Sequence, residues 1–181
     1  MVYVYEIDGQ LMVIRNTQPQ VEKVIQLDRM PPMPYQNGYM AILRADFDTQ
    51  KVWYELVETL EGAKSRKKAE ILAYDSSPAV NEFTLGGRTL WLTPEERASL
   101  KILLDAEKAA GKTSTVLWHK EQRFDIDDID MGLLMLIQLE LYASEAHGHT
   151  QQHLATVSSF ETNKEVNDYE FQNDYPPRPV L

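Results

Sequence analysis

A run of apolar residues in the C-terminal half constrains the fold most strongly. Residues 131–143 read MGLLMLIQLELYA and are interrupted by Gln138 and Glu140. The run is too short to span a bilayer, which takes about 20 such residues. A helix that is apolar on nearly all sides is normally buried. We therefore expect a long helix over about 128–157, with its apolar part packed inside a domain or in a subunit interface.

The N-terminal residues instead alternate between apolar and polar side chains, as strands do. Residues 2–7 and 10–15 flank Asp8-Gly9, a dipeptide that supplies the positive φ angles of a tight hairpin turn. Two further strands are expected at about 39–46 and 51–57. The N-terminal part is therefore predicted to be a small antiparallel sheet.

Helix signals follow this sheet. Residues 60–73 are rich in helix formers and predict a connector helix. Thr93, Pro94 and Glu96 form the signature of a capping box at the start of a second helix, in which Leu100, Leu103 and Leu104 line one face. Two hairpins are expected, at residues 84–92 around Gly86-Gly87 and at residues 114–126, where Val116, Trp118, Phe124 and Ile126 alternate.

The sequence thus predicts an α+β fold, with a small antiparallel β N-terminal unit, a connector helix, and then β-hairpins packed with two main helices. The expected parts are residues 1–58 (β-rich unit), 59–74 (connector helix), 75–170 (α+β domain) and 171–181 (a proline-bearing tail).

Polar residues before the helices are expected to cap them. Asp75, Ser76 and Ser77 precede Pro78 and suit the start of a short helix that runs to about Asn81. The aspartates of residues 125–130 lack the spacing of a calcium loop, and their charge suits the start of the long helix. No reaction is needed to explain either stretch.

Composition excludes some classes of function. The formal net charge of -10 would repel a phosphate backbone, so nucleic acid is not expected as a partner. A membrane is not expected either, because the longest apolar run is too short to span a bilayer. The chain has no cysteine, which excludes disulfides and thiolate metal sites and fits a reducing compartment. No cofactor motif is present, and no cofactor is expected.

The three tryptophans are each expected in a strand, as core anchors: Trp53, Trp91 and Trp118. The alternative is an aromatic platform for sugars.

Three histidines occur in the stretch EAHGHTQQHL. On a helix, Glu145, His149 and His153 lie along one stripe, and the two histidines have the separation of a metal-binding pair. Gly148 weakens the helix at this point, the H-E-x-x-H pattern is missing, and no third or fourth ligand is evident. We therefore predict no metal and no catalytic residue here, with His153 as a packed or capping histidine. A metal-dependent hydrolase that uses His149 and His153 remains an alternative.

Several short pieces of the chain carry a resemblance to a known family. They are KKAEILAYDSSPAVNEF, the hairpin that ends in LWL before a capped helix, LELYA, TQQH and YEFQNDYP, in this order over about residues 64–178. Together they resemble an uncharacterised domain family of phage and prophage proteins of gut bacteria, found among tail and tail-fibre-assembly-like genes. Its recurring residues correspond to Trp91, Leu139, Glu140, Tyr142, His153 and Tyr175, and we call them the framework residues.

The resemblance implies a non-enzymatic, tail-associated protein, either a tail-fibre assembly accessory or a minor structural component of the tail. Its partners would be tail or tail-fibre proteins, and it would act in the bacterial cytoplasm during assembly or in the virion. The apolar helix also suggests a homo-oligomer, such as a trimer. The alternative is a carbohydrate- or receptor-binding module that uses the aromatics near Tyr35, Tyr39 and Trp53.

Overall fold

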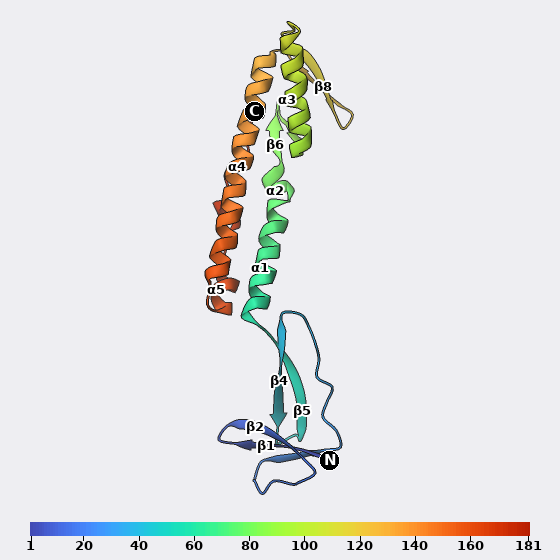
Figure 1. Ribbon diagram of the computed structural model, residues 1–181, viewed down its shortest axis with the longest axis vertical. Coiled ribbons are helices and arrows are strands. Elements are labelled where there is room, and N and C mark those ends of the chain that lie inside the picture. Colours follow the sequence, from blue (N-terminus) through green and yellow to red (C-terminus); the bar gives the residue numbers. More distant parts are fainter. The chain divides into compact units, whose positions relative to one another are not determined.

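The computed structural model describes residues 1–181 and confirms the α+β class (Figure 1). Two compact units make up the chain. The first unit contains residues 1–66 and 161–167, and the second contains residues 67–160 and 168–181. The expected connector helix is therefore divided between the units, and the expected tail belongs to the second unit.

A three-stranded antiparallel sheet opens the first unit. It consists of β1 (Val2–Ile7), β2 (Gln10–Arg15) and β3 (Val24–Leu27), in the order β2-β1-β3. The predicted turn is confirmed, because Asp8 and Gly9 both have positive φ. β3 was not expected from the sequence. It pairs with β1 and places Ile25 opposite Val4, and both side chains are fully buried.

A second hairpin completes the strands of this unit. It is formed by β4 (Tyr39–Asp46) and β5 (Lys51–Glu58), close to the expected ranges. At the end of this hairpin where the connector helix begins, the backbones of Gly38 and Gly62 approach so closely that a Cβ atom on Gly62 would lie 2.0 Å from the Gly38 oxygen. Thr59 fixes this approach, since both its backbone N–H and its hydroxyl donate to that oxygen at 2.9 Å.

The connector is α1 (Leu60–Asp75), which ends two residues beyond the expected range. The short α2 (Pro78–Asn81) follows. The expected serine cap of α2 is wrong, since Ser77 occupies the N-cap position without a side-chain capping bond. Its hydroxyl instead donates to the Tyr74 carbonyl at 2.6 Å and so satisfies the end of α1.

The second unit contains a small hairpin and a capped helix. The hairpin joins β6 (Phe83–Leu85) to β7 (Arg88–Leu90), and α3 (Pro94–Ala109) follows it. The predicted capping box is confirmed, with Thr93 and Glu96 bonded in both directions. Of the leucines expected on one face of α3, Leu104 is buried, Leu100 is half-buried and Leu103 is exposed.

The third hairpin, β8 (Thr115–His119) with β9 (Gln122–Ile126), presents a different face than expected. Leu117 pairs with Phe124 on the packed side, whereas Val116 and Trp118 are exposed. The expectation that the tryptophans are core anchors is therefore wrong for Trp118, which is 68% exposed, and for Trp53, which is 45% exposed. Each lies in a two-stranded hairpin, and such a hairpin can leave one face to solvent.

The long helix is α4 (Ile129–Ser159), which runs alongside α3 in Figure 1. Asp128 caps it by accepting from the Asp130 and Met131 backbone N–H groups. Only one side of its apolar part is buried. The opposite side carries four exposed apolar residues, which we call the apolar stripe: Met131 (53% exposed), Leu134 (45%), Ile137 (49%) and Leu141 (66%).

Two apolar clusters hold the second unit together. The first joins the β6–β7 hairpin, α3 and the N-terminal half of α4, and its buried members are Phe83, Leu90, Leu92, Leu104, Ile129, Leu136 and Leu139. The second consists of Ile71, Val157 and Phe171. The chain end is paired rather than loose, because the Leu181 N–H donates to the Thr84 carbonyl. None of the helices combines the length and the apolar character that a membrane span requires.

Candidate functional site

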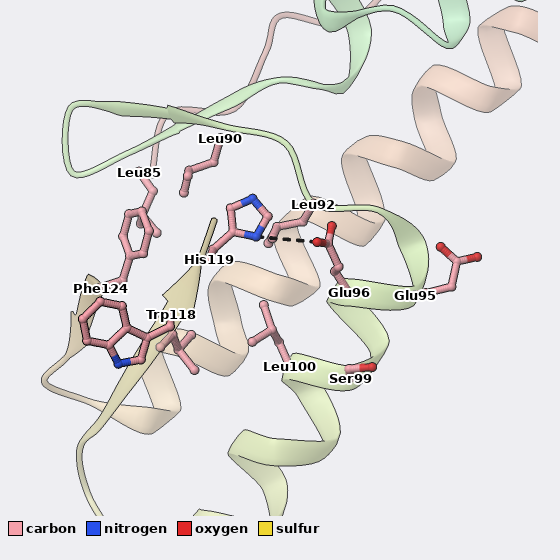
Figure 2. A pocket seen from close by; sticks show the side chains of 11 residues that line it. Leu85, Leu90, Leu92, Glu95, Glu96, Ser99, Leu100, Trp118, His119 and Phe124 are labelled. Atoms are coloured by element: carbon pink, nitrogen blue, oxygen red, sulfur yellow. Dashed lines mark ion pairs between the residues drawn. The ribbon is translucent and has the colours of Figure 1, made fainter. Parts of the chain in front are cut away.

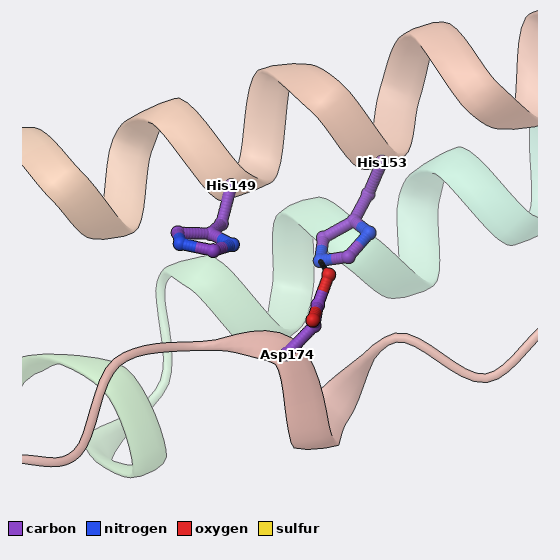
Figure 3. A group of neighbouring side chains, drawn as sticks. All are labelled: His149, His153 and Asp174. Carbon is purple, nitrogen blue, oxygen red and sulfur yellow. Dashed lines mark ion pairs between the residues drawn. The ribbon is translucent and has the colours of Figure 1, made fainter.

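The C-terminal segment, residues 168–175, lies along α4 and builds the candidate site. Two contacts hold it in place. Phe171 packs into the cluster with Ile71 and Val157, and the buried Lys67 ammonium donates to the Tyr169 carbonyl at 3.2 Å. The short 3₁₀ helix η1 (Gln172–Asp174) follows, so Asp174 is carried to the side of α4 on which His149 and His153 lie (Figure 3).

His153 is the best-defined side chain of the site. Only 2% of the residue is exposed, and its Nδ1 lies 2.7 Å from the Tyr169 hydroxyl. Its Nε2 lies 3.9 Å from Asp174 Oδ2, which is an ion-pair distance and too long for a hydrogen bond. The Nε2 atom is therefore buried without a hydrogen-bond partner.

His149 lies one helical turn before His153 and faces the same way (Figure 3). Its Nδ1 atom is also buried without a hydrogen-bond partner. One ligand atom from each of His149, His153 and Asp174 lies within 4.8 Å of the other two. The structure therefore supplies a third candidate ligand for the predicted histidine pair.

Glu145, the third candidate named from the sequence, is exposed and does not join this group. The helical spacing places Glu145 on the same side of α4 as His149 and His153. This side of the helix is buried at residue 153 but exposed at residue 145. Asp174 and Tyr169 were missed because they lie on a separate segment of the chain. No local pattern links them to α4, and only the packing of Phe171 brings them there.

A hydrogen-bond network borders the site. The Thr150 hydroxyl, in a residue only 1% exposed, donates to Asp75 Oδ1 at 2.7 Å and lies 2.8 Å from the Tyr175 hydroxyl. The Tyr175 ring packs 5.4 Å from that of His153 and 5.1 Å from that of Tyr74, measured between centroids. The network fixes the position of the segment around Asp174 relative to α4.

Burial dominates the electrostatics of the site. It lowers the pKa of His153 below its ordinary value, although the Asp174 carboxylate opposes this shift and His149 adds to it. Burial also raises the pKa of the Tyr175 phenol, against the effect of its hydrogen bond to Thr150. At neutral pH the site therefore presents a neutral His153 imidazole, which is the form that binds metal ions.

The framework residues are engaged in contacts within the chain. The Glu140 carboxylate accepts from Arg97 Nε at 2.6 Å, and the Tyr142 hydroxyl donates to the Val80 carbonyl at 2.7 Å. Leu139 belongs to the first apolar cluster, and Trp91 is half-buried just after β7. Together with His153 and Tyr175, each of them supports the packing of the second unit.

A pocket of about 310 Å³ lies between α3 and the two hairpins (Figure 2). Leucines and Phe124 form most of its lining, and His119 and Glu96 stand at its polar side, with Nδ1 of the histidine 3.6 Å from Oε1 of the glutamate. Glu96 already closes the capping box through its other oxygen. The pocket suits a small apolar group, and the Glu96 carboxylate at its polar side is already engaged by His119 and Thr93.

Comparison with known proteins identified no match. No family model, no curated protein and no solved structure matches this chain.

Proposed function

We propose that this chain is a phage or prophage tail-associated protein that acts through protein–protein contacts and not through catalysis. The apolar stripe of α4 carries this proposal. Met131, Leu134, Ile137 and Leu141 are spaced so that they share one side of the helix, and all four are at least 45% exposed. Contiguous apolar side chains on a surface are typical of an interaction site.

The framework residues support the same role. In the family that the sequence resembles, residues that recur would include the reacting groups if the family performed a reaction. Here Glu140 is paired with Arg97, and Tyr142 is bonded to the Val80 carbonyl. Glu140 and Tyr142 maintain the packing that presents α4, so a role in shaping a contact surface accounts for these two residues.

We take the partner to be a tail or tail-fibre chain that lays an apolar helix or strand on the apolar stripe. The first experiment is immunodetection of the protein in purified particles and in the soluble lysate of an induced culture. Retention at a fixed copy number would indicate a structural component, whereas presence in the lysate in complex with an identified tail or fibre chain would indicate an assembly accessory. Absence of both associations would contradict the proposal.

Ile137→Glu tests whether the apolar stripe is the contact surface. The exposed position should accept the charge without loss of folding, while the association with the tail chain should be lost because a carboxylate would be buried against apolar groups. Ile102→Glu is the matched control, since Ile102 is a 70% exposed aliphatic residue on α3. Equal association of both variants would exclude the apolar stripe.

A second candidate function is glycan or receptor binding by the first unit. Tyr35 is 90% exposed and Trp53 is 45% exposed, so both rings are available for stacking on a sugar. This role predicts a change of tryptophan fluorescence on titration with host glycans that Trp53→Ala abolishes. Trp118→Ala, which removes another exposed tryptophan, should leave the binding unchanged.

A further inference from the structure

We propose that His149, His153 and Asp174 form a binding site for a divalent transition-metal ion of the zinc type. The site lies entirely in the second unit, between α4 and η1 (Figure 3). It goes beyond the proposed contact function and does not depend on it.

The first support is the convergence of three ligand groups. A donor atom from each residue lies within 4.8 Å of the other two. Zinc binds imidazole nitrogen and carboxylate oxygen at about 2.0–2.2 Å, which places neighbouring donors roughly 3.5 Å apart. The Asp174 carboxylate is already 3.9 Å from Nε2 of His153, and its side chain is 68% exposed, so it can turn further toward the histidines.

The second support is independent of the clustering. His153 is 98% buried in the protein, yet its Nε2 atom faces Asp174 without a hydrogen-bond partner, and Nδ1 of His149 is also unpartnered. A buried polar atom without a partner costs free energy. An ion between these atoms would satisfy both nitrogens at once.

Tyr169 provides the outer contact that metal-binding histidines usually have. Its hydroxyl lies 2.7 Å from Nδ1 of His153. When Nδ1–H donates to this oxygen, the tautomer is fixed, and the lone pair of Nε2 points toward His149 and Asp174. Tyr169 is thus a positioning residue for the site.

The donor set decides which class of ion fits. Two imidazoles and one carboxylate suit zinc, cobalt or nickel, whereas calcium and magnesium prefer ligands that are all oxygen. Three protein ligands leave a fourth position for water, and the exposed Asp174 gives the ion a path from solvent. A bound ion would connect η1 to α4, and it would therefore stabilise the folded protein.

The test is calorimetric titration of the full-length, chelator-treated protein with zinc chloride, followed by thermal unfolding with and without zinc. We expect one ion per chain and a higher unfolding temperature in zinc. Asp174→Asn and His149→Gln should each weaken binding by at least ~10-fold, because each removes a ligand. His147→Gln, an exposed histidine on the same helix that lies outside the cluster, should bind zinc like the wild type.

Cobalt provides a second readout, since its visible spectrum reports the coordination. Wild-type protein with cobalt should show the bands of a four-coordinate site with nitrogen ligands, and His149→Gln should lose them. Tyr169→Phe should bind more weakly while the stoichiometry is unchanged. The proposal is overturned if the wild type does not bind zinc, or if the Asp174→Asn, His149→Gln double variant binds it equally well.

Discussion

At the scale of single residues, two glycines in helices have opposite roles. Gly62, in α1, meets the Gly38 backbone so closely that an added Cβ atom would lie 2.0 Å from a carbonyl oxygen. Gly148, in α4, has nothing within 4 Å of that position and no positive φ. The first glycine is required by the packing of the first unit, whereas the second only weakens its helix.

Gly62→Ala should therefore lower the free energy of unfolding by roughly 1–3 kcal/mol, because the backbone must move to remove the clash. Gly148→Ala is the control and should raise that free energy by about 0.5–1 kcal/mol, since alanine is the better helix former. Urea denaturation followed by circular dichroism measures both. Equal effects of the two substitutions would show that the Gly38–Gly62 approach is not required.

At the scale of elements, the start of α3 links helix stability to pH. The Thr93 backbone N–H donates to Glu96 Oε2 at 2.7 Å, and this bond is the main reason why the pKa of Glu96 lies below its ordinary value. A carboxyl group whose pKa is lower in the folded state stabilises the protein above its unfolded-state pKa. This contribution is lost as the pH falls through the folded-state pKa.

Glu96→Gln keeps an oxygen acceptor for the cap but cannot ionise. We expect the wild type to be more stable at neutral pH and the difference to disappear in acid, as protonation makes the two side chains alike. The difference should be at most roughly 1 kcal/mol, because the carboxylate is partly screened by solvent. Denaturation across the acid range measures it, with Glu95→Gln as the control of the same charge change in the same turn. An equal pH dependence for both variants would argue against the capping box as its cause.

At the scale of the whole molecule, the apolar stripe of α4 predicts that copies of the chain associate with one another. In the absence of a tail partner, we expect this surface to pair copies of the chain, because burial of apolar area is the main driving force of association. Light scattering at micromolar concentration should then give more than the monomer mass, and Leu141→Glu should reduce it to the monomer. Ile102→Glu should leave the mass unchanged. A monomeric wild type would contradict the predicted homo-oligomer.

Local chemistry in the sequence determined the class and most elements of the fold. The Asp8-Gly9 and Gly86-Gly87 turns, the capping box at Thr93 and the long helix were all predictable, because each depends on backbone preferences of a few neighbouring residues. The histidine pair of α4 was found in the same way, from helical spacing alone.

Tertiary structure alone decided the remaining features. β3 carries only four residues and is defined by its pairing with β1, so no pattern of its own marks it as a strand. Either face of the β8–β9 hairpin could have packed against the rest of the unit. Leu117 and Phe124 lie on the face that packs, and Trp118 on the other face is exposed. Asp174 joined the histidines only because Phe171 anchors a distant segment against α4. Periodicity and turn chemistry act between neighbours in the chain, whereas this site depends on contacts between residues that are far apart in it.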